Sequence, residues 1–249
     1  YSHYGDWAPP AGNAIADSMG NGALSAETPG ALVSTAFYGY ALDLLAGTAG
    51  VLGRADDRRH YRELADRTRA AFHAAFWNEA KSGYGAGNQA GNAVALQLDL
   101  VPADLRPRVV AALVRDVAEH DYHLTTGNLC TKYLLEVLAA EGHMEAALAI
   151  ATQTDYPGWG YMLAQGATTV WERWEFKTGG GMNSHNHPML GSIGAWLHRW
   201  VAGLAVGAPR DGRAHFLIRP PAVGRLTHAR SSLRTVWGEA AVAWQRRQR

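Results

Sequence analysis

Helical segments of two kinds alternate along this chain, and the alternation limits the folds that it can adopt. Residues 30–49 are apolar on nearly every face of a helix, whereas residues 57–78 carry one apolar stripe opposite Arg and Glu side chains. The same contrast returns in residues 90–98 and 102–120, and again in residues 127–139 and 144–154. A helix that is apolar all round needs burial on every side, and an amphipathic helix can cover it. We therefore predict a mainly α fold, an α/α toroid with an inner and an outer ring.

One more helix and then a change of period follow. From Pro188 to Leu204 apolar residues recur at helical spacings, which is the strongest helix signal in the chain. Beyond it, strands are indicated at residues 214–219, 226–232 and 236–244, with turn residues between them.

These patterns predict two domains. Residues 1–208 are expected to form part of a six-hairpin α/α barrel, and residues 209–249 the start of a β-sandwich. Fewer helices are present than a closed ring of six hairpins needs, and the chain opens at Tyr1 within a loop rich in functional groups. We expect the N-terminal side of the toroid to lie outside this sequence.

Composition excludes several classes of function. The chain has 23 basic and 22 acidic side chains and is 47% hydrophobic, so it has no strong field that would attract a nucleic acid. No apolar run approaches the roughly 20 residues of a membrane span, and no signal-peptide pattern occurs, so no membrane partner is expected. No phosphate-binding glycine motif occurs either, and no cofactor is predicted. The single cysteine, Cys130, lies in an apolar helical run and is expected to be buried. Compartment and oligomeric state stay open.

The predicted loops hold the residues that suit carbohydrate chemistry. Carbohydrate sites combine aromatic faces, which stack on sugar C–H surfaces, with carboxylates and amides that bind hydroxyl groups. Four of the nine tryptophans lie in these loops, namely Trp7, Trp159, Trp171 and Trp174. A sugar site built from the loops is therefore the favoured interpretation.

Glu172 is the most informative of the loop residues. It lies between two tryptophans and beside Arg173. A general base must be ionised to take a proton from water, and Glu172 is a candidate for that role. The alternative is that Glu172 pairs with Arg173 or caps a turn. Glu175 is interpreted as a solvated loop carboxylate.

The remaining candidates each have a structural alternative. Asp6 either caps a loop or binds sugar hydroxyls, and Tyr38 lies either in the core or against the substrate. His185 and His187 are separated by one residue, but no suitably placed third ligand accompanies them, so no metal site is predicted. Three further amides are expected to cap helices rather than bind ligand: Asn88, Gln89 and Asn92.

Two ordered motifs resemble the bacterial α-L-rhamnosidases of glycoside hydrolase family 78. They are Ala-Thr-Thr-Val-Trp-Glu, ending at Glu172, and Met-Asn-Ser-His-Asn-His, ending at His187. The resemblance extends over nearly the whole chain and includes Tyr4-Gly-Asp-Trp7, Ala26-Glu-Thr-Pro29, Leu124-Thr-Thr-Gly127, Trp159-Gly-Tyr161 and Phe216-Leu-Ile-Arg-Pro220. Two features depart from the family pattern: a short, glycine-rich segment between Glu175 and Met182, and Asn128 where an apolar or aromatic residue is expected.

The resemblance implies an (α/α)6 barrel followed by a β-sandwich, and hydrolysis of terminal α-L-rhamnosyl bonds with inversion. It implies that Glu172 is the general base and that the general acid lies upstream of Tyr1. It also implies that His187 lies near the sugar and that Asp6, Trp7 and Trp159 line the pocket. Trp171, next to Glu172, and Tyr38 complete the residues expected to bind substrate. The expected partners are rhamnose-containing glycosides or oligosaccharides.

Two other functions stay open at this point. One is a toroid glycosidase for a different sugar, which the sugar released from aryl glycosides would distinguish. The other is a non-catalytic sugar-binding or scaffold domain, which would bind rhamnose without hydrolysing a rhamnoside. We also expect this chain alone to be inactive and prone to aggregation.

Overall fold

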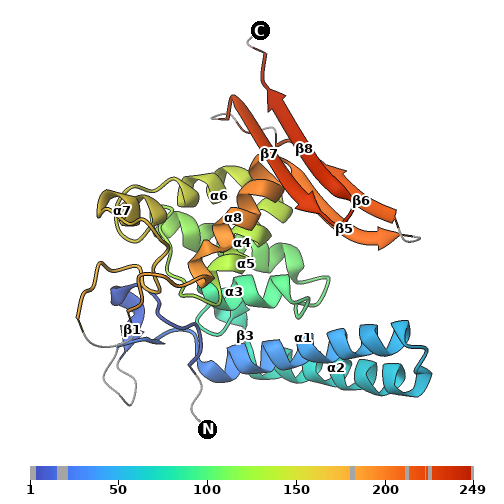
Figure 1. Ribbon diagram of the computed structural model, residues 1–249. Coiled ribbons are helices and arrows are strands. Elements are labelled where there is room, and N and C mark those ends of the chain that lie inside the picture. Colours follow the sequence, from blue (N-terminus) through green and yellow to red (C-terminus); the bar gives the residue numbers. More distant parts are fainter. Residues whose placement is uncertain are drawn as a thin grey trace.

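The chain folds into a helical body followed by two β-hairpins (Figure 1). The computed structural model describes residues 4–15, 22–179, 183–210, 213–221, 223 and 226–247. The α-helices are α1 (Gly30–Val51), α2 (Ala55–Phe76), α3 (Gln89–Gln97), α4 (Arg106–Glu119), α5 (Thr131–Ala140), α6 (Met144–Ala151), α7 (Trp159–Ala164) and α8 (Ile193–Trp196). The short 3-10 helices are η1 (Ala11–Asn13), η2 (Glu79–Lys81) and η3 (Met189–Ser192), and η4 (Leu197–Val201) is a π-helix. In the described part of the chain no helix is both long and apolar enough to cross a membrane.

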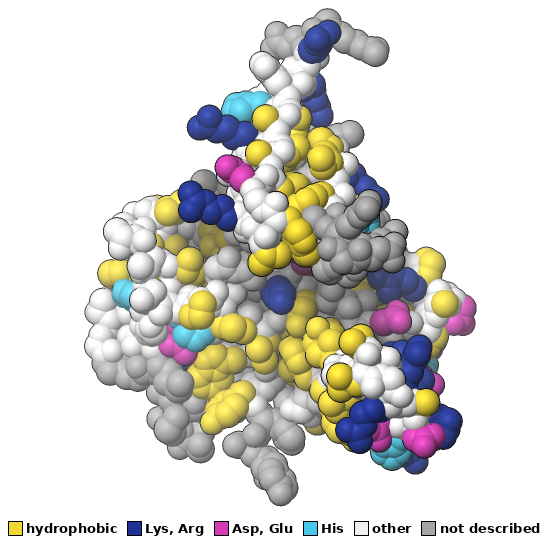
Figure 2. Space-filling model, turned by 45° about the vertical axis from the view of Figure 1, so that its right-hand side comes forward, with side chains coloured by type: hydrophobic (Ala, Val, Ile, Leu, Met, Phe, Trp, Pro, Cys, Tyr) yellow, Lys and Arg dark blue, Asp and Glu magenta, His cyan; other side chains and the backbone are white. Residues whose placement is uncertain are grey.

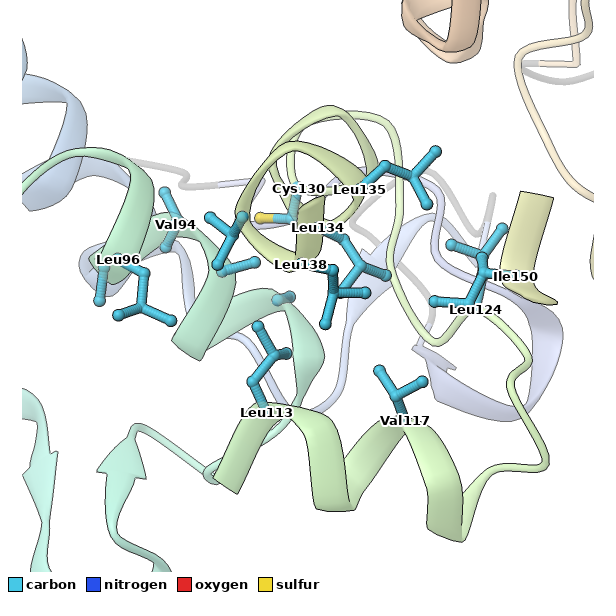
Figure 3. Packing of buried hydrophobic residues seen from close by; sticks show 14 of the residues in the cluster. Val94, Leu96, Leu113, Val117, Leu124, Cys130, Leu134, Leu135, Leu138 and Ile150 are labelled. Atoms are coloured by element: carbon cyan, nitrogen blue, oxygen red, sulfur yellow. The ribbon is translucent and has the colours of Figure 1, made fainter. Parts of the chain in front are cut away.

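The core lies where α3 and α5 meet the helices that cover them. α5 contacts α3, α6 and α8. Leu113 and Val117 on α4 point toward Leu134 and Leu138 on α5, and all four side chains are buried (Figure 3). Cys130 is buried in the same cluster, as predicted. The predicted pairing of a buried helix with an amphipathic one is thus confirmed for α3 with α4 and for α5 with α6.

The first hairpin, α1 and α2, lies at one side of the helical body (Figure 1). α2 buries its apolar stripe, including Phe72, against α1. The prediction that α1 is buried on every side is wrong, because Tyr38 is 53% and Leu45 45% exposed. Tyr38 therefore lies in the surface rather than in the core.

The C-terminal helix is irregular. The residues expected to form one helix from Pro188 onward are wound as 3-10 in η3, α in α8 and π in η4. Trp196 donates to the Leu135 carbonyl, and Trp200 donates to the Glu136 carboxylate of α5. Both indoles are thereby fixed to α5, and the wider π turn accompanies this attachment.

Antiparallel hairpins form the strand region. The strands are β1 (Ala14–Ile15), β2 (Leu24–Ser25), β3 (Trp77–Asn78), β4 (Gly83–Tyr84), β5 (Leu204–Arg210), β6 (Arg213–Ile218), β7 (His228–Thr235) and β8 (Gly238–Gln245). Leu204 of β5 pairs with Ile218 of β6, and His228 of β7 pairs with Gln245 of β8. Strand β5 was not predicted, because Gly207 and Pro209 interrupt its alternation and the register shifts between Gly207 and Arg210.

Candidate active site

Two loops far apart in the sequence, around Trp7 and Asn128, contact each other at the candidate site. The backbone N–H of Asn128 donates to the Trp7 carbonyl at 2.7 Å. A Cβ atom at Gly127 would lie 2.2 Å from the same carbonyl, so only glycine permits this close approach. Ala8, directly after Trp7, adopts a positive φ of 52°. This backbone geometry fixes the direction in which the Trp7 indole leaves the loop.

Asp6 holds the two loops together. Its Oδ2 accepts from Gly127 N at 2.7 Å, and its Oδ1 accepts from Leu129 N at 3.2 Å and Cys130 N at 3.0 Å. Burial raises the pKa of Asp6 to about 6, and the hydrogen bonds from these backbone amides oppose that rise. Asp6 is only 1% exposed, and its hydrogen bonds to three backbone amides are those of a loop cap, one of the two predicted roles. The expected contact between Asp6 and the sugar stays a prediction.

Glu172 is held between the first loop and the segment that ends at His187. Trp7 Nε1 donates to Glu172 Oε1 at 3.2 Å, and Ser184 N donates to Oε2 at 2.9 Å. The Glu172 N–H in turn donates to the Ser184 carbonyl at 2.8 Å. The side chain is 5% exposed, so the carboxylate is fixed and largely withdrawn from bulk water. Arg173 donates to the Gly22 carbonyl at 3.2 Å.

The other tryptophans of the predicted loops pack against aromatic neighbours. Trp171 stacks on His185 with ring centroids 4.8 Å apart, and Trp159 meets Trp174 edge to face at 5.2 Å. Trp159 is buried and donates to the Leu190 carbonyl. Glu175 is not a freely solvated carboxylate as expected, because Tyr156 Oη donates to its Oε1 at 2.9 Å.

A cavity of about 390 Å³ opens beside Trp7. Its wall is formed by Tyr4, Trp7, Asn128, Leu129, His187 and Met189. The Tyr4 and Trp7 rings meet at 89° with centroids 4.9 Å apart. The backbone N–H of His187 donates to the Val170 carbonyl, while His187 Nδ1 is buried and has no hydrogen-bond partner in the described structure. An aromatic face and an unpaired imidazole nitrogen are features that suit a sugar.

The structure thus brings some of the predicted residues together and leaves others apart. Trp7 and His187 line the cavity, and Glu172 adjoins it through its hydrogen bond with Trp7. Trp159, Trp171 and Tyr38 do not line it, and Met182 of the second motif lies outside the described residues. The prediction from the residues missed Leu129, Met189 and the Ser184 amide, because an apolar wall and a backbone donor leave no distinctive signal in a sequence.

Other hollows in the surface are larger but carry no comparable chemistry. A groove of about 650 Å³ runs along α4, and one of about 810 Å³ runs along β7 and β8. None of their lining residues belongs to the loops that carry Glu172. Within the described ranges no three His, Cys, Asp or Glu side chains are grouped as a metal site would need.

Comparison with known proteins decides the family. The profile of the bacterial alpha-L-rhamnosidase 6 hairpin glycosidase domain matches residues 1–201, and that of the bacterial alpha-L-rhamnosidase C-terminal domain matches residues 203–249. The chain belongs to the bacterial α-L-rhamnosidase family. The mainly α architecture of a six-hairpin glycosidase with a partial β-domain is thereby confirmed. The boundary predicted between residues 208 and 209 stays a prediction.

Individual members of the α-L-rhamnosidase family agree with this assignment. An alpha-L-rhamnosidase of Streptomyces avermitilis is 37% identical over 90% of this chain and 22% of its own length. The structure of an alpha-L-rhamnosidase from Dictyoglumus thermophilum superposes with a TM-score of 0.89 at 38% identity, covering 100% of this chain and 27% of that one. A Streptomyces avermitilis alpha-L-rhamnosidase complexed with L-rhamnose gives a TM-score of 0.82 at 34% identity, covering 99% and 23%. The chain therefore spans about a quarter of the length of these relatives.

Proposed function

We propose that the protein containing this chain releases terminal α-L-rhamnose from glycosides by an inverting hydrolysis, with Glu172 as general base. The observation that carries the proposal is the Glu172 carboxylate, held by Trp7 Nε1 and Ser184 N beside a cavity that Trp7 and His187 line. Membership of the α-L-rhamnosidase family supports the choice of sugar, as does the relative solved in complex with L-rhamnose.

The geometry of Glu172 suits the activation of water. Each carboxylate oxygen accepts one hydrogen bond from the protein, and a carboxylate oxygen has lone pairs for a second. A water that donates to Glu172 loses its proton to the carboxylate as its oxygen attacks the anomeric carbon. The two donors keep the carboxylate in one orientation, so the attacking water approaches from one side of the sugar.

Inversion needs a second carboxyl group on the opposite face of the sugar, at about 6.5–9.5 Å from the base. Asp6 is not among the residues that line the cavity, and it accepts three backbone hydrogen bonds, which leaves it poorly suited to protonate a leaving group. We propose that the general acid comes from a segment outside this sequence.

The proposed sugar contacts divide into two groups. Trp7 and His187 contact rhamnose directly, because they line the cavity. Trp159 and Trp171 shape the site from behind through their packing on Trp174 and His185. The proposed substrates are rhamnose-containing glycosides or oligosaccharides.

The role of Glu172 is tested by Glu172→Gln in the full-length natural protein that contains this chain. Loss of the base is expected to lower kcat by about 10²- to 10⁴-fold with an aryl α-L-rhamnoside. Rhamnose binding, measured by calorimetry, should change by no more than a few-fold, because glutamine retains the shape of the side chain. Glu175→Gln removes the same charge from the same loop and is the matched control, with near-native kcat expected. A near-native rate in Glu172→Gln would exclude Glu172 as the base.

A further inference from the structure

Asn128 is a buried amide with no hydrogen-bond partner for its side chain. The residue is 2% exposed. Neither its Oδ1 nor its Nδ2 has a hydrogen-bond partner among the described residues. A buried amide without partners costs free energy, because both atoms lose their bonds to water on folding. An arrangement of this kind calls for an explanation such as a ligand that supplies the missing bonds.

The position of Asn128 points to that ligand. Asn128 lies in the wall of the cavity beside Trp7, and its backbone N–H is fixed to the Trp7 carbonyl at 2.7 Å. His187 lines the same cavity and contributes a second unpartnered polar atom, Nδ1. Two segments almost sixty residues apart thus place buried, unpartnered polar atoms within the wall of one apolar cavity. The Asn128 carboxamide can turn toward the cavity without breaking a protein hydrogen bond.

We propose that Asn128 is a specificity-determining residue that binds two neighbouring hydroxyl groups of a sugar ring. One hydroxyl donates to Oδ1 and the other accepts from Nδ2, since a carboxamide presents an acceptor and a donor side by side. The diol belongs either to the terminal rhamnose or to the sugar to which it is attached. The proposal rests on the proposed function only for the identity of the sugar.

The first test separates ligand binding from a structural role. Asn128→Leu keeps the approximate volume and removes both unpaired atoms. Because no protein hydrogen bond is lost, the thermal midpoint should stay the same or rise, whereas a structural amide would lower it on replacement. The dissociation constant for L-rhamnose, or KM for a rhamnosyl disaccharide, should rise about 10- to 100-fold. Asn128→Ala removes the same atoms without filling the space, so it serves as a second variant if the leucine side chain does not fit the site.

The second test identifies the hydroxyl groups by a double-mutant cycle. Calorimetry with L-rhamnose and its 2-, 3- and 4-deoxy analogues is carried out on the full-length wild type and on both variants. In the wild type, removal of a contacted hydroxyl should weaken binding about tenfold or more, and in the variants the same removal should have no effect. For the attached sugar, the coupling is read from the KM values of rhamnosyl disaccharides that lack one of its hydroxyl groups. If only these analogues couple to Asn128, the diol belongs to the attached sugar.

The outcomes distinguish this proposal from the proposed function. If the wild type binds rhamnose and no analogue couples to Asn128, the role of Asn128 is overturned while the function stands. If the wild type prefers another sugar, the proposed function fails, and the same cycle with deoxy analogues of that sugar decides on Asn128. A wild type that binds no sugar overturns both.

Discussion

Trp7 combines two tasks in one side chain. Its ring forms a wall of the cavity, and its Nε1 donates to Glu172 Oε1 at 3.2 Å. The backbone around it is specialised, with a positive φ at Ala8 and a close approach at Gly127. A hydrogen bond to an ionised group contributes more than a neutral one, so the N–H is expected to matter for the orientation of Glu172.

Trp7→Phe tests this expectation in the full-length protein. Phenylalanine keeps an aromatic wall but cannot donate to Glu172. We expect kcat to fall about 10- to 100-fold, with a much smaller change in KM for an aryl rhamnoside. The matched control is Trp77→Phe, since Trp77 Nε1 also donates to a carboxylate, that of Glu79, at 3.0 Å. If kcat is unchanged and only KM rises, Trp7 contributes to substrate binding alone.

At the scale of elements, a distant residue, Asp6, holds the turn that precedes α5. The sequence pattern predicted a helix from Gly127, whereas α5 begins at Thr131. The amides of Gly127, Leu129 and Cys130 are bound by Asp6. A carboxylate from another loop thus binds the turn that leads into α5, while the Thr131 N–H at the start of the helix donates to the Gly127 carbonyl. Helix placement and the position of Trp7 are therefore coupled through Asp6.

The buried Asp6 carboxyl group makes the free energy of unfolding depend on pH. The pKa of Asp6 is raised from 3.8 to about 6, so between these pH values the folded chain binds a proton that the unfolded chain has released. The stability that Asp6 contributes is thus fully present below about pH 4 and is lost as pH rises through about 6, by up to ~3 kcal/mol. Asp6→Asn should lack this loss. The thermal midpoint of wild type minus that of the variant should therefore fall between pH 4 and pH 7, and a difference independent of pH would contradict the raised pKa.

At the scale of the whole molecule, one side of the first hairpin stays uncovered. Tyr38, Leu45 and Leu52 recur every seventh residue, and each is at least 45% exposed. Figure 2 shows hydrophobic side chains next to charges of both signs at the end of this hairpin, where Arg54 pairs with Asp57. An apolar stripe of this length on a surface favours association with other molecules.

Leu45→Lys is expected to reduce self-association of the 249-residue chain. The lysine interrupts the stripe without disturbing the core, because Leu45 is already 45% exposed. Light scattering as a function of concentration measures the change. Leu163→Lys alters an exposed leucine on α7, away from the stripe, and should leave scattering unchanged. Equal effects of the two substitutions would show that added charge, and not the stripe, controls association.

Local signals were enough to predict most elements and some caps. Asn88 caps α3 by accepting from Gly91 N, as its position suggested. Asn92 Nδ2 donates to the Gly87 carbonyl, and Gln89 Oε1 accepts from Thr125 N, so these two amides bind loop backbone, whereas Asn88 is the N-cap of α3. In contrast, α7 was missed inside the segment expected to be loop, because six residues are too few for a period to show.

The sequence by itself determined the pairing of a buried helix with an amphipathic one in α3–α4 and α5–α6, the family motifs around Glu172 and His187, and the burial of Cys130. These depend on hydrophobic period and on residue order, which are local properties. Only the tertiary structure decided that Asp6 binds the backbone amides of the turn before α5, that Trp7 holds Glu172, and that Asn128 lies unpaired in the cavity wall. Each of these depends on a contact between segments more than a hundred residues apart, or on a partner that is absent, and neither leaves a trace in local sequence.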